Sequence, residues 1–120
     1  MTPDQVPGRP SVAVFDVSFI SLKLVLPPVI ALLARPARLV TLIKPQFEAE
    51  RSEVGRGGVV RDAAVRAAVV QRIRTFGETL PGGALRWSGC CESPLRGPAG
   101  NIEYVACWEL GAASVNAPRE

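Results

Sequence analysis

A run of five residues near the middle of the chain, residues 39–43, holds four aliphatic side chains and is followed directly by a lysine and a proline. A continuous apolar run of this length predicts a β-strand covered on both faces, as in a parallel sheet. Proline cannot donate a hydrogen bond to a sheet and holds the preceding residue extended, so the strand should end at Lys44. Lys44 would then lie at the carboxyl end of a core strand, where open α/β sheets place their ligands.

The apolar pattern before this strand predicts one more strand and a helix. Residues 11–15 form a second short apolar run, which ends at Asp16. Residues 22–33 have the apolar content of a helix, but Pro27 and Pro28 do not belong in a helix interior. We therefore expect an irregular turn, followed by a helix that carries proline in its first turn.

The pattern after Lys44 predicts a long polar connection, a helix and two strands. Asp62 is expected to cap an amphipathic helix whose apolar positions recur every three or four residues. Residues 84–92 and 102–110 are expected to be strands, joined by a loop too short to hold a helix. The apolar positions of the helix are Val65, Val69, Ile73, Phe76 and Leu80.

The order strand, helix, strand, helix, strand, strand predicts an α/β fold. The first three strands should lie parallel with right-handed crossovers, and the last two should form an antiparallel pair at one edge. This arrangement is half of a doubly wound, Rossmann-like sheet. The sequence has no glycine-rich turn of the G-x-G-x-x-G kind that would hold a nucleotide or an adenosyl cofactor.

The length of the chain and its composition set outer limits on its organisation. Its 120 residues form one domain at most, with residues 1–10 as a poorly ordered lead-in, 11–110 as the folded part and 111–120 as a flexible tail. The net charge of +3 is compatible with an RNA partner but does not argue for one. The first twenty residues lack a basic segment followed by an apolar core and a small-residue cleavage site, so we expect no signal peptide. The apolar stretch at 22–34 is too short and too interrupted by prolines to span a membrane, so we expect a cytoplasmic protein without membrane contact.

The three cysteines, two of them adjacent, and the absence of histidine limit the possible chemistry. Without histidine or a C-x-x-C motif a zinc site is not expected, and Ser–His and Cys–His nucleophile schemes are excluded. We expect no metal and three buried thiols in a reducing compartment. The cysteines are Cys90, Cys91 and Cys107.

Three ionisable residues should meet at one rim of the predicted sheet. Asp16 and Lys44 end neighbouring strands, and Glu103 begins a strand expected to run the other way. The chain has two lysines against twelve arginines, and lysine differs from arginine in that it can lose its proton. Carboxylates beside a partly desolvated lysine can orient it for proton transfer. The alternatives are a strand-end lysine that extends into solvent and a structural cluster of ion pairs.

Four ordered sequence blocks resemble those of one known family. They are DVSFISL at 16–22, KPQFE at 44–48, VGRGGVVRD at 54–62 and GPAGNIE at 97–103. Together they are similar to the TlyA family, which comprises hemolysin A-like ribosomal RNA 2′-O-methyltransferases with an FtsJ-type catalytic domain. The resemblance extends from residue 12 to about residue 110, and its specificity rests on four blocks in the same order.

This resemblance implies an activity and assigns roles to the rim. In the family, a Lys-Asp-Lys-Glu tetrad promotes methyl transfer from S-adenosylmethionine to a ribose 2′-hydroxyl. By motif, Asp16 is the tetrad aspartate, Lys44 the second lysine and Glu103 the glutamate. The cofactor-binding residues are unknown, with Asp16 the nearest candidate. Ribosomal RNA is the implied partner, and three arginines between residues 51 and 61 suit contacts with its phosphates, although a merely solvated loop is the alternative. They are Arg51, Arg56 and Arg61.

The sequence also departs from the family pattern. The S4-like RNA-binding domain, the first tetrad lysine and the glycine-rich cofactor loop of full-length relatives have no counterpart here. We therefore expect the carboxyl half of the catalytic domain, inactive alone and without tight binding of S-adenosylmethionine. The alternative is a non-catalytic module that binds RNA or a partner. A sheet cut at an interior strand favours pairing with a complementary amino-terminal chain or with itself.

Overall fold

The computed structural model describes residues 8–16 and 21–111, and these residues build one four-stranded sheet in the order β1-β2-β4-β3. β1 (Val12–Phe15) and β2 (Ala37–Ile43) are parallel. β4 (Tyr104–Leu110) runs antiparallel to both β2 and β3 (Leu85–Glu92). The α/β fold with an antiparallel last strand is therefore confirmed. The expected lead-in and tail lie almost wholly outside the described residues.

Two α-helices provide most of the cover of the sheet. α3 (Ala63–Glu78) begins where its apolar periodicity predicts, and the Asp62 carboxylate caps it by accepting a hydrogen bond from the Ala64 amide at 2.8 Å. α1 (Leu22–Ile30) begins earlier than expected and contains both prolines in its interior. Its start is fixed by Ser21, whose hydroxyl accepts a hydrogen bond from the Lys23 amide at 3.0 Å.

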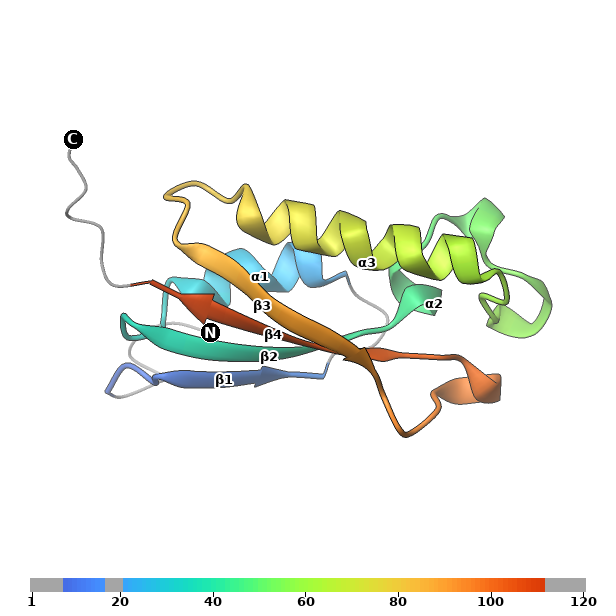
Figure 1. Ribbon diagram of the computed structural model, residues 1–120, viewed down its shortest axis with the longest axis horizontal. Helices are drawn as coiled ribbons and strands as arrows, with labels where there is room; N and C mark the ends of the chain where they lie inside the picture. Colours follow the sequence, from blue (N-terminus) through green and yellow to red (C-terminus); the bar gives the residue numbers. More distant parts are fainter. Residues whose placement is uncertain (1–7, 17–20, 112–120) are drawn as a thin grey trace.

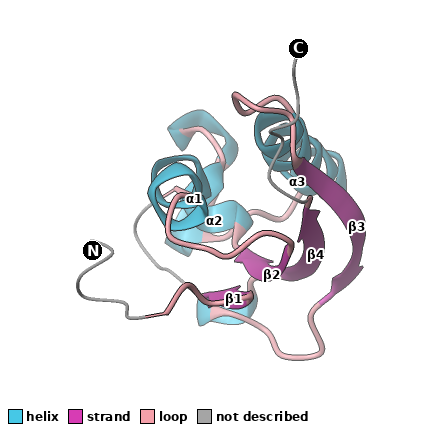
Figure 2. Cartoon of the chain, turned by 90° about the vertical axis from the view of Figure 1, so that its left-hand side faces the viewer, coloured by secondary structure: helices cyan, strands magenta, loops and turns pink. Residues whose placement is uncertain are grey.

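The helices lie on a single face of the sheet. Figures 1 and 2 show α1 and α3 on the same side of the four strands, with the short α2 (Pro45–Glu48) beside α1. Side chains of β2 alternate accordingly, with Leu39, Thr41 and Ile43 buried beneath the helices. In the described part of the chain no α-helix covers the other face, where Val40 and Leu42 are half-buried. The expectation of a strand covered on both faces is therefore not met.

The core lies between the helices and the sheet and is centred on Trp108 of β4. Trp108 is 1% exposed, and its indole nitrogen donates a hydrogen bond to the Thr41 hydroxyl at 3.0 Å. Trp87 of β3 packs edge-on against it, with ring centroids 4.9 Å apart. α3 approaches this pair at Gly77, where a methyl group would overlap the Trp108 ring. Glycine thus allows the close contact between helix and sheet.

The three cysteines lie elsewhere than expected. None forms a disulfide, but all three are exposed, so the prediction of buried thiols is wrong. Cys107 projects from β4 between buried Ala106 and Trp108, towards the face without helices, and Cys90 and Cys91 lie in the edge strand β3. The exposure of Cys107 follows from the uncovered face, whereas Cys90 and Cys91 lie on opposite faces of an edge strand, and an apolar sequence pattern alone reveals neither situation.

Candidate active site

Asp16 and Lys44 meet at the carboxyl ends of the two parallel strands. β1 ends at Phe15 and β2 at Ile43, so the next residue of each strand lies at the same edge of the sheet. The Lys44 ammonium lies 2.6 Å from the Asp16 carboxylate. The Lys44 side chain is only 12% exposed, whereas that of Asp16 is 62% exposed. An ion pair with one partner in water contributes at most about 1 kcal/mol to stability, so its interest is the orientation it gives to Lys44.

Glu103 lies at the same end of the sheet but has a different partner. It directly precedes β4, whose first residue, Tyr104, pairs with Ile43. Its carboxylate is buried, at 7% exposure, and accepts a hydrogen bond from the Gln46 amide at 2.8 Å. The structure therefore brings all three predicted residues to one rim, with Asp16 bound to Lys44 and Glu103 bound to the residue two positions after Lys44.

Gln46 and Gly97 hold Glu103 and had not been singled out in the sequence. A methyl group at Gly97 would overlap the Glu103 carboxylate and would come within 3.2 Å of the Gln46 amide nitrogen. The Gln46 amide oxygen is buried, and none of the residues that the structure describes donates a hydrogen bond to it. Both residues belong to the KPQFE and GPAGNIE blocks, so the motifs contained the signal. Their contact was not predictable because it joins segments 51 residues apart in the chain.

Glu48 connects the rim to the start of α1. Its carboxylate accepts hydrogen bonds from the Ser21 hydroxyl and the Leu22 amide, each at 2.7 Å. Burial raises the pKa of Glu48, and the hydrogen bonds from Leu22 and Ser21 partly offset that effect. The loop that follows Lys44 is thereby fixed to the first turn of the helix that follows Asp16.

Asn101 joins two glycine-containing turns near Glu103. Its side chain is 2% exposed, accepts a hydrogen bond from the Val60 amide at 3.0 Å and donates to the carbonyls of Gly58 and Pro98 at 3.0 Å each. The two turns are η3 (Arg56–Gly58) and η4 (Pro98–Gly100). This side chain was not among the predicted site residues, although it lies in the fourth sequence block.

The three predicted RNA-contacting arginines are all exposed on the connection between β2 and α3. Arg56 and Arg61 lie in the turn that Asn101 fixes, and the Arg61 guanidinium donates to the Arg56 carbonyl at 3.0 Å. Arg51 lies in η2 (Arg51–Glu53). The connection predicted as long and polar thus holds α2 and the short turns η2 and η3, with its three arginines exposed.

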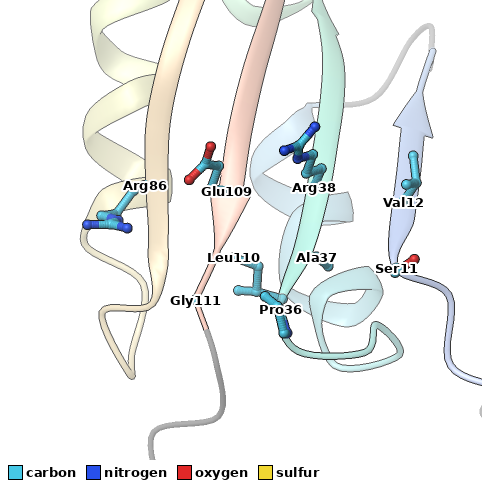
Figure 3. Close-up of a pocket in the computed structure, with 9 residues that line it drawn as sticks. All are labelled: Ser11, Val12, Pro36, Ala37, Arg38, Arg86, Glu109, Leu110 and Gly111. Atoms are coloured by element: carbon cyan, nitrogen blue, oxygen red, sulfur yellow. The ribbon is translucent and has the colours of Figure 1, made fainter.

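The connections from β1 to α1 and from β2 to α2 have no glycine-rich turn in their sequence. The connection from β1 to α1 contains no glycine in its sequence, and the connection from β2 to α2 is Lys44 alone. A groove of about 620 Å³ opens at the opposite end of the sheet, beside Val12, Arg38 and Glu109 (Figure 3). That groove is remote from Lys44, so it provides no pocket for the proposed chemistry. In the described part of the chain no helix is long and apolar enough to cross a membrane.

The comparison with protein families agrees with this geometry. The model of the FtsJ-like methyltransferase family matches residues 2–110. The chain belongs to the FtsJ-like methyltransferase family. This FtsJ-like chain is 42% identical over 104 residues to the "16S/23S rRNA (cytidine-2'-O)-methyltransferase TlyA" of Mycobacterium tuberculosis, a match that covers 87% of the chain and 38% of TlyA.

Two further relatives support the same assignment for the FtsJ-like chain. The "Putative rRNA methyltransferase YqxC" of Bacillus subtilis is 42% identical over 102 residues, which cover 85% of this chain and 35% of YqxC. The solved structure "Putative hemolysin from Streptococcus thermophilus" superposes with a TM-score of 0.81 and 38% identity, covering 90% of this chain and 38% of that one. The resemblance to TlyA is confirmed, and the chain spans less than half the length of each of these proteins.

Proposed function

We propose that this chain supplies the acid–base part of an rRNA 2′-O-ribose methyltransferase, as the carboxyl half of the catalytic domain, and is inactive alone. The observation that carries the proposal is the rim of the sheet, where Lys44 is paired with Asp16 and the buried Glu103 is held beside them. This rim occurs in a chain 42% identical to a protein named as an rRNA 2′-O-methyltransferase. In the complete enzyme S-adenosylmethionine would supply an activated methyl group, held by residues outside this chain.

Lys44 would orient the ribose hydroxyl and, in its neutral amine form, would accept the hydroxyl proton, which yields the ammonium that Asp16 pairs with. A methyl donor that is already activated leaves the enzyme chiefly the tasks of alignment and deprotonation. The side chain of Lys44 is mostly buried yet ends at the sheet edge, and Asp16 binds its ammonium from the solvent side. Glu103, fixed by Gln46, would keep the far side of the rim polar and rigid.

Substitution of Lys44 tests this role in a fusion of the chain to the part of TlyA that precedes the matched residues. Lys44→Ala should lower methyl transfer to rRNA by at least about 100-fold, the lower end of the usual contribution of an acid–base group. Lys44→Arg should fail as well, because a guanidinium cannot accept the proton. Methyl transfer is measured with labelled S-adenosylmethionine, and folding of each variant by circular dichroism.

Lys23→Ala is the matched control. Lys23 is the other lysine of the chain and lies exposed on α1, 6.0 Å from the centre of the Phe76 ring, so its loss should change activity little. Near-normal turnover by Lys44→Arg would show that Lys44 acts only as a fixed positive charge. Near-normal turnover by Lys44→Ala would exclude the proposed function of the rim.

A second candidate function is a non-catalytic module that binds RNA. Exposed Arg56 and Arg61 favour it, because they flank the turn residues that Asn101 binds and do not lie on a loose loop. Arginine side chains and backbone amides are common contacts to nucleic-acid phosphates. In the complete enzyme the same surface would hold ribosomal RNA against the rim, so the two functions share one binding surface. Either function would place the protein with ribosomes in the cytoplasm.

Replacing the exposed arginines tests the RNA contact. Arg56→Ala and Arg61→Ala should each weaken binding of the fusion to an rRNA fragment and reduce the salt dependence of the affinity by about one phosphate contact. Affinity is measured by fluorescence anisotropy at several salt concentrations. Arg35→Ala, exposed at the opposite end of β2, is the control. If the salt dependence of the affinity were unchanged in both variants, these arginines would not contact RNA phosphates and the loop would only be solvated.

A further inference from the structure

Asn101 is a buried polar side chain that lies two positions before Glu103 in the chain. It is 2% exposed, and a buried amide is costly unless its donors and its acceptor are satisfied. Both are satisfied here, because its oxygen accepts from the Val60 amide and its nitrogen donates to the carbonyls of Gly58 and Pro98. The side chain therefore joins the turn η3 to the turn η4.

The loop that contains η4 fixes the place of Glu103. At the base of this loop the Ser93 amide donates to the Glu103 carbonyl at 2.7 Å. Further along, the Gly97 amide donates to the Asn101 carbonyl at 2.8 Å. Gly97 also lies so close to the Glu103 carboxylate that a methyl group on Gly97 would overlap it. The carboxylate thus contacts both the loop and the Gln46 amide, and a shift of the loop would move it.

The turn η4 holds a backbone conformation that depends on outside support. Ala99 has a φ of 57°, in the left-handed region that residues with a side chain rarely adopt. Such residues persist where the surrounding structure fixes them, and they are frequent at functional sites. Asn101 supplies part of that support, since it donates to the carbonyl of Pro98, the residue before Ala99. Loss of the amide would therefore free η4 to relax, and Gly97 with it.

The Asn101 side chain also links this loop to the turn that carries Arg56 and Arg61. Among the described residues, the hydrogen bonds between that turn and the loop of η4 are the ones that Asn101 makes with Val60 and Gly58. The Arg61 guanidinium donates to the Arg56 carbonyl, so both arginines belong to the segment that Asn101 holds. One side chain therefore connects the exposed arginines to the acid–base rim.

We propose that Asn101 is a positioning residue of the rim, which fixes the Glu103 carboxylate and sets its place relative to RNA held by Arg56 and Arg61. The proposal rests on the proposed function, since its catalytic effect requires that Glu103 take part in methyl transfer. Asn101 itself would touch neither the hydroxyl nor the methyl donor, and it acts through Glu103. Reacting groups must be aligned closely, and a displacement of about 1 Å can lower a rate on the order of 100-fold.

The alternative is a purely structural role, in which Asn101 stabilises the fold without affecting the rim. Both roles predict a lower free energy of unfolding for Asn101→Ala, so stability alone does not separate them. The two roles differ at Glu103. A positioning role changes the surroundings of the Glu103 carboxylate and the rate of the folded enzyme, and a structural role changes neither.

The first test uses the 120-residue chain and needs no activity. The Gln46 side-chain amide donates to the Glu103 carboxylate, so its signals in nuclear magnetic resonance report that contact. In Asn101→Ala these signals should move, and their hydrogen exchange with solvent should become severalfold faster. Thr41→Val is the matched control, because it also removes a buried hydrogen bond, the one from the Trp108 indole, and should leave the Gln46 signals in place. Wild-type Gln46 signals in Asn101→Ala would overturn the proposal.

The second test measures kcat and KM for methyl transfer in the fusion with the preceding part of TlyA, at a temperature where every variant is folded. Asn101→Ala should lower kcat at least about tenfold, whereas Thr41→Val should keep kcat near that of the wild type. In a Glu103→Gln background, Asn101→Ala should lower kcat by less than about twofold further, because the effects of residues that act as one unit are not additive. Equal losses of kcat in the two backgrounds, or a change in KM alone, would overturn the proposal.

The two tests separate the positioning role from the proposed function. If Lys44→Ala kept near-normal methyl transfer, the proposed function would be wrong, and the Gln46 signals would still show whether Asn101 positions Glu103. If Lys44→Ala lost activity but Asn101→Ala kept the wild-type kcat, the proposed function would stand and the positioning role would be wrong.

Discussion

Two side chains that form one ion pair differ greatly in their surroundings. Lys44 extends from a strand in the middle of the sheet and is nearly covered, whereas Asp16 ends an edge strand and lies mostly in water. The surrounding protein therefore restrains the ion pair mainly on the Lys44 side. A substrate or a second polypeptide that approaches from β1 would reach the Asp16 carboxylate first and change the setting of Lys44. The chemistry of the rim thus depends on what covers Asp16.

Glu48 is a partly buried carboxylate that holds the first turn of α1, and its loss should destabilise the chain. Glu48→Ala would leave the Leu22 amide without its acceptor, at a cost of about 1–3 kcal/mol. Burial raises the pKa of Glu48 above 4.5, so the folded state keeps this proton to higher pH than the unfolded state. The contribution of this group to stability is then complete below about pH 4.5 and is lost as the pH rises through the raised pKa.

Urea denaturation between pH 4 and pH 7 measures both effects. Glu48→Gln cannot titrate, so its stability should fall less than that of the wild type as the pH rises through this range. Glu92→Gln, exposed on the edge strand, is the control and should keep the wild-type slope. If the free energy of unfolding of Glu48→Gln and of the wild type showed the same pH dependence, the pKa of Glu48 would not be raised in the folded state.

At the residue scale the sequence located the charges but not all their partners. Asp16 and Lys44 were predictable because each follows an apolar run and parallel strands end at one edge. The contact between Gln46 and Glu103 was not, since it depends on how α2 and the turn at Gly97 meet in space. The exposure of Cys107 was also not predicted, because apolar alternation does not show which face of a sheet lacks helices.

At the scale of elements, the loops around the rim form one connected unit. The Asn101 side chain bridges η3 and η4, and the Arg66 guanidinium adds hydrogen bonds to the carbonyls of Val60 and Arg61 and to the Tyr104 hydroxyl. These loops join β2 to α3 and β3 to β4. Without this bridge the turn that carries Arg56 and Arg61 would depend on its own short hydrogen bonds.

Asn101→Ala should destabilise the loops and the fold together. It removes three hydrogen bonds of a buried side chain and leaves the Val60 amide unpaired, which costs about 1–3 kcal/mol. Hydrogen exchange of the Val60 amide should become faster, and the urea midpoint should fall. Gln71→Ala removes one exposed hydrogen bond on α3 and is the control. Unchanged exchange at Val60 in Asn101→Ala would show that the turn holds without the bridge.

The two helices show how far local sequence predicts an element. The start of α3 was predictable because a capping aspartate and an apolar stripe agree. The start of α1 was not predictable, because its two prolines predict an irregular turn in a segment that is helical and capped by Ser21. The prolines are tolerated since both lie on the exposed side of a short helix, and Glu48 supplies an acceptor for the first turn from another part of the chain. The Ser21 cap and a contact distant in sequence therefore together set where the helix begins.

At the scale of the whole molecule, the chain corresponds to less than half of each of its relatives. Its fold matches the corresponding part of those proteins, and its described residues bring Asp16, Lys44 and Glu103 to one rim of the sheet. The fold class and the half-sheet were predictable from the order of strands and helices. The uncovered face of the sheet was not predictable, because the face on which the helices pack depends on the arrangement of all the elements and not on the sequence pattern of one of them.

The isolated chain should not bind S-adenosylmethionine tightly. It lacks a glycine-rich turn between a strand and a helix, which would place backbone amides against the cofactor. Isothermal titration calorimetry should show no binding in the micromolar range, and the fusion with the preceding part of TlyA serves as the positive control. A micromolar or tighter dissociation constant for the chain alone would place the cofactor site within these 120 residues.

The edge-on packing of Trp87 against Trp108 determines which events in this molecule can be followed by optical spectroscopy. These are the only two tryptophans of the chain, and both lie where α3 meets β3 and β4. Their fluorescence and near-ultraviolet circular dichroism will therefore act as a local gauge of that junction during unfolding. A change confined to β1, which β2 separates from β4 and which β2 and β4 separate from β3, should leave both signals almost unchanged. A tryptophan introduced at the β1 edge would then be read against a constant background.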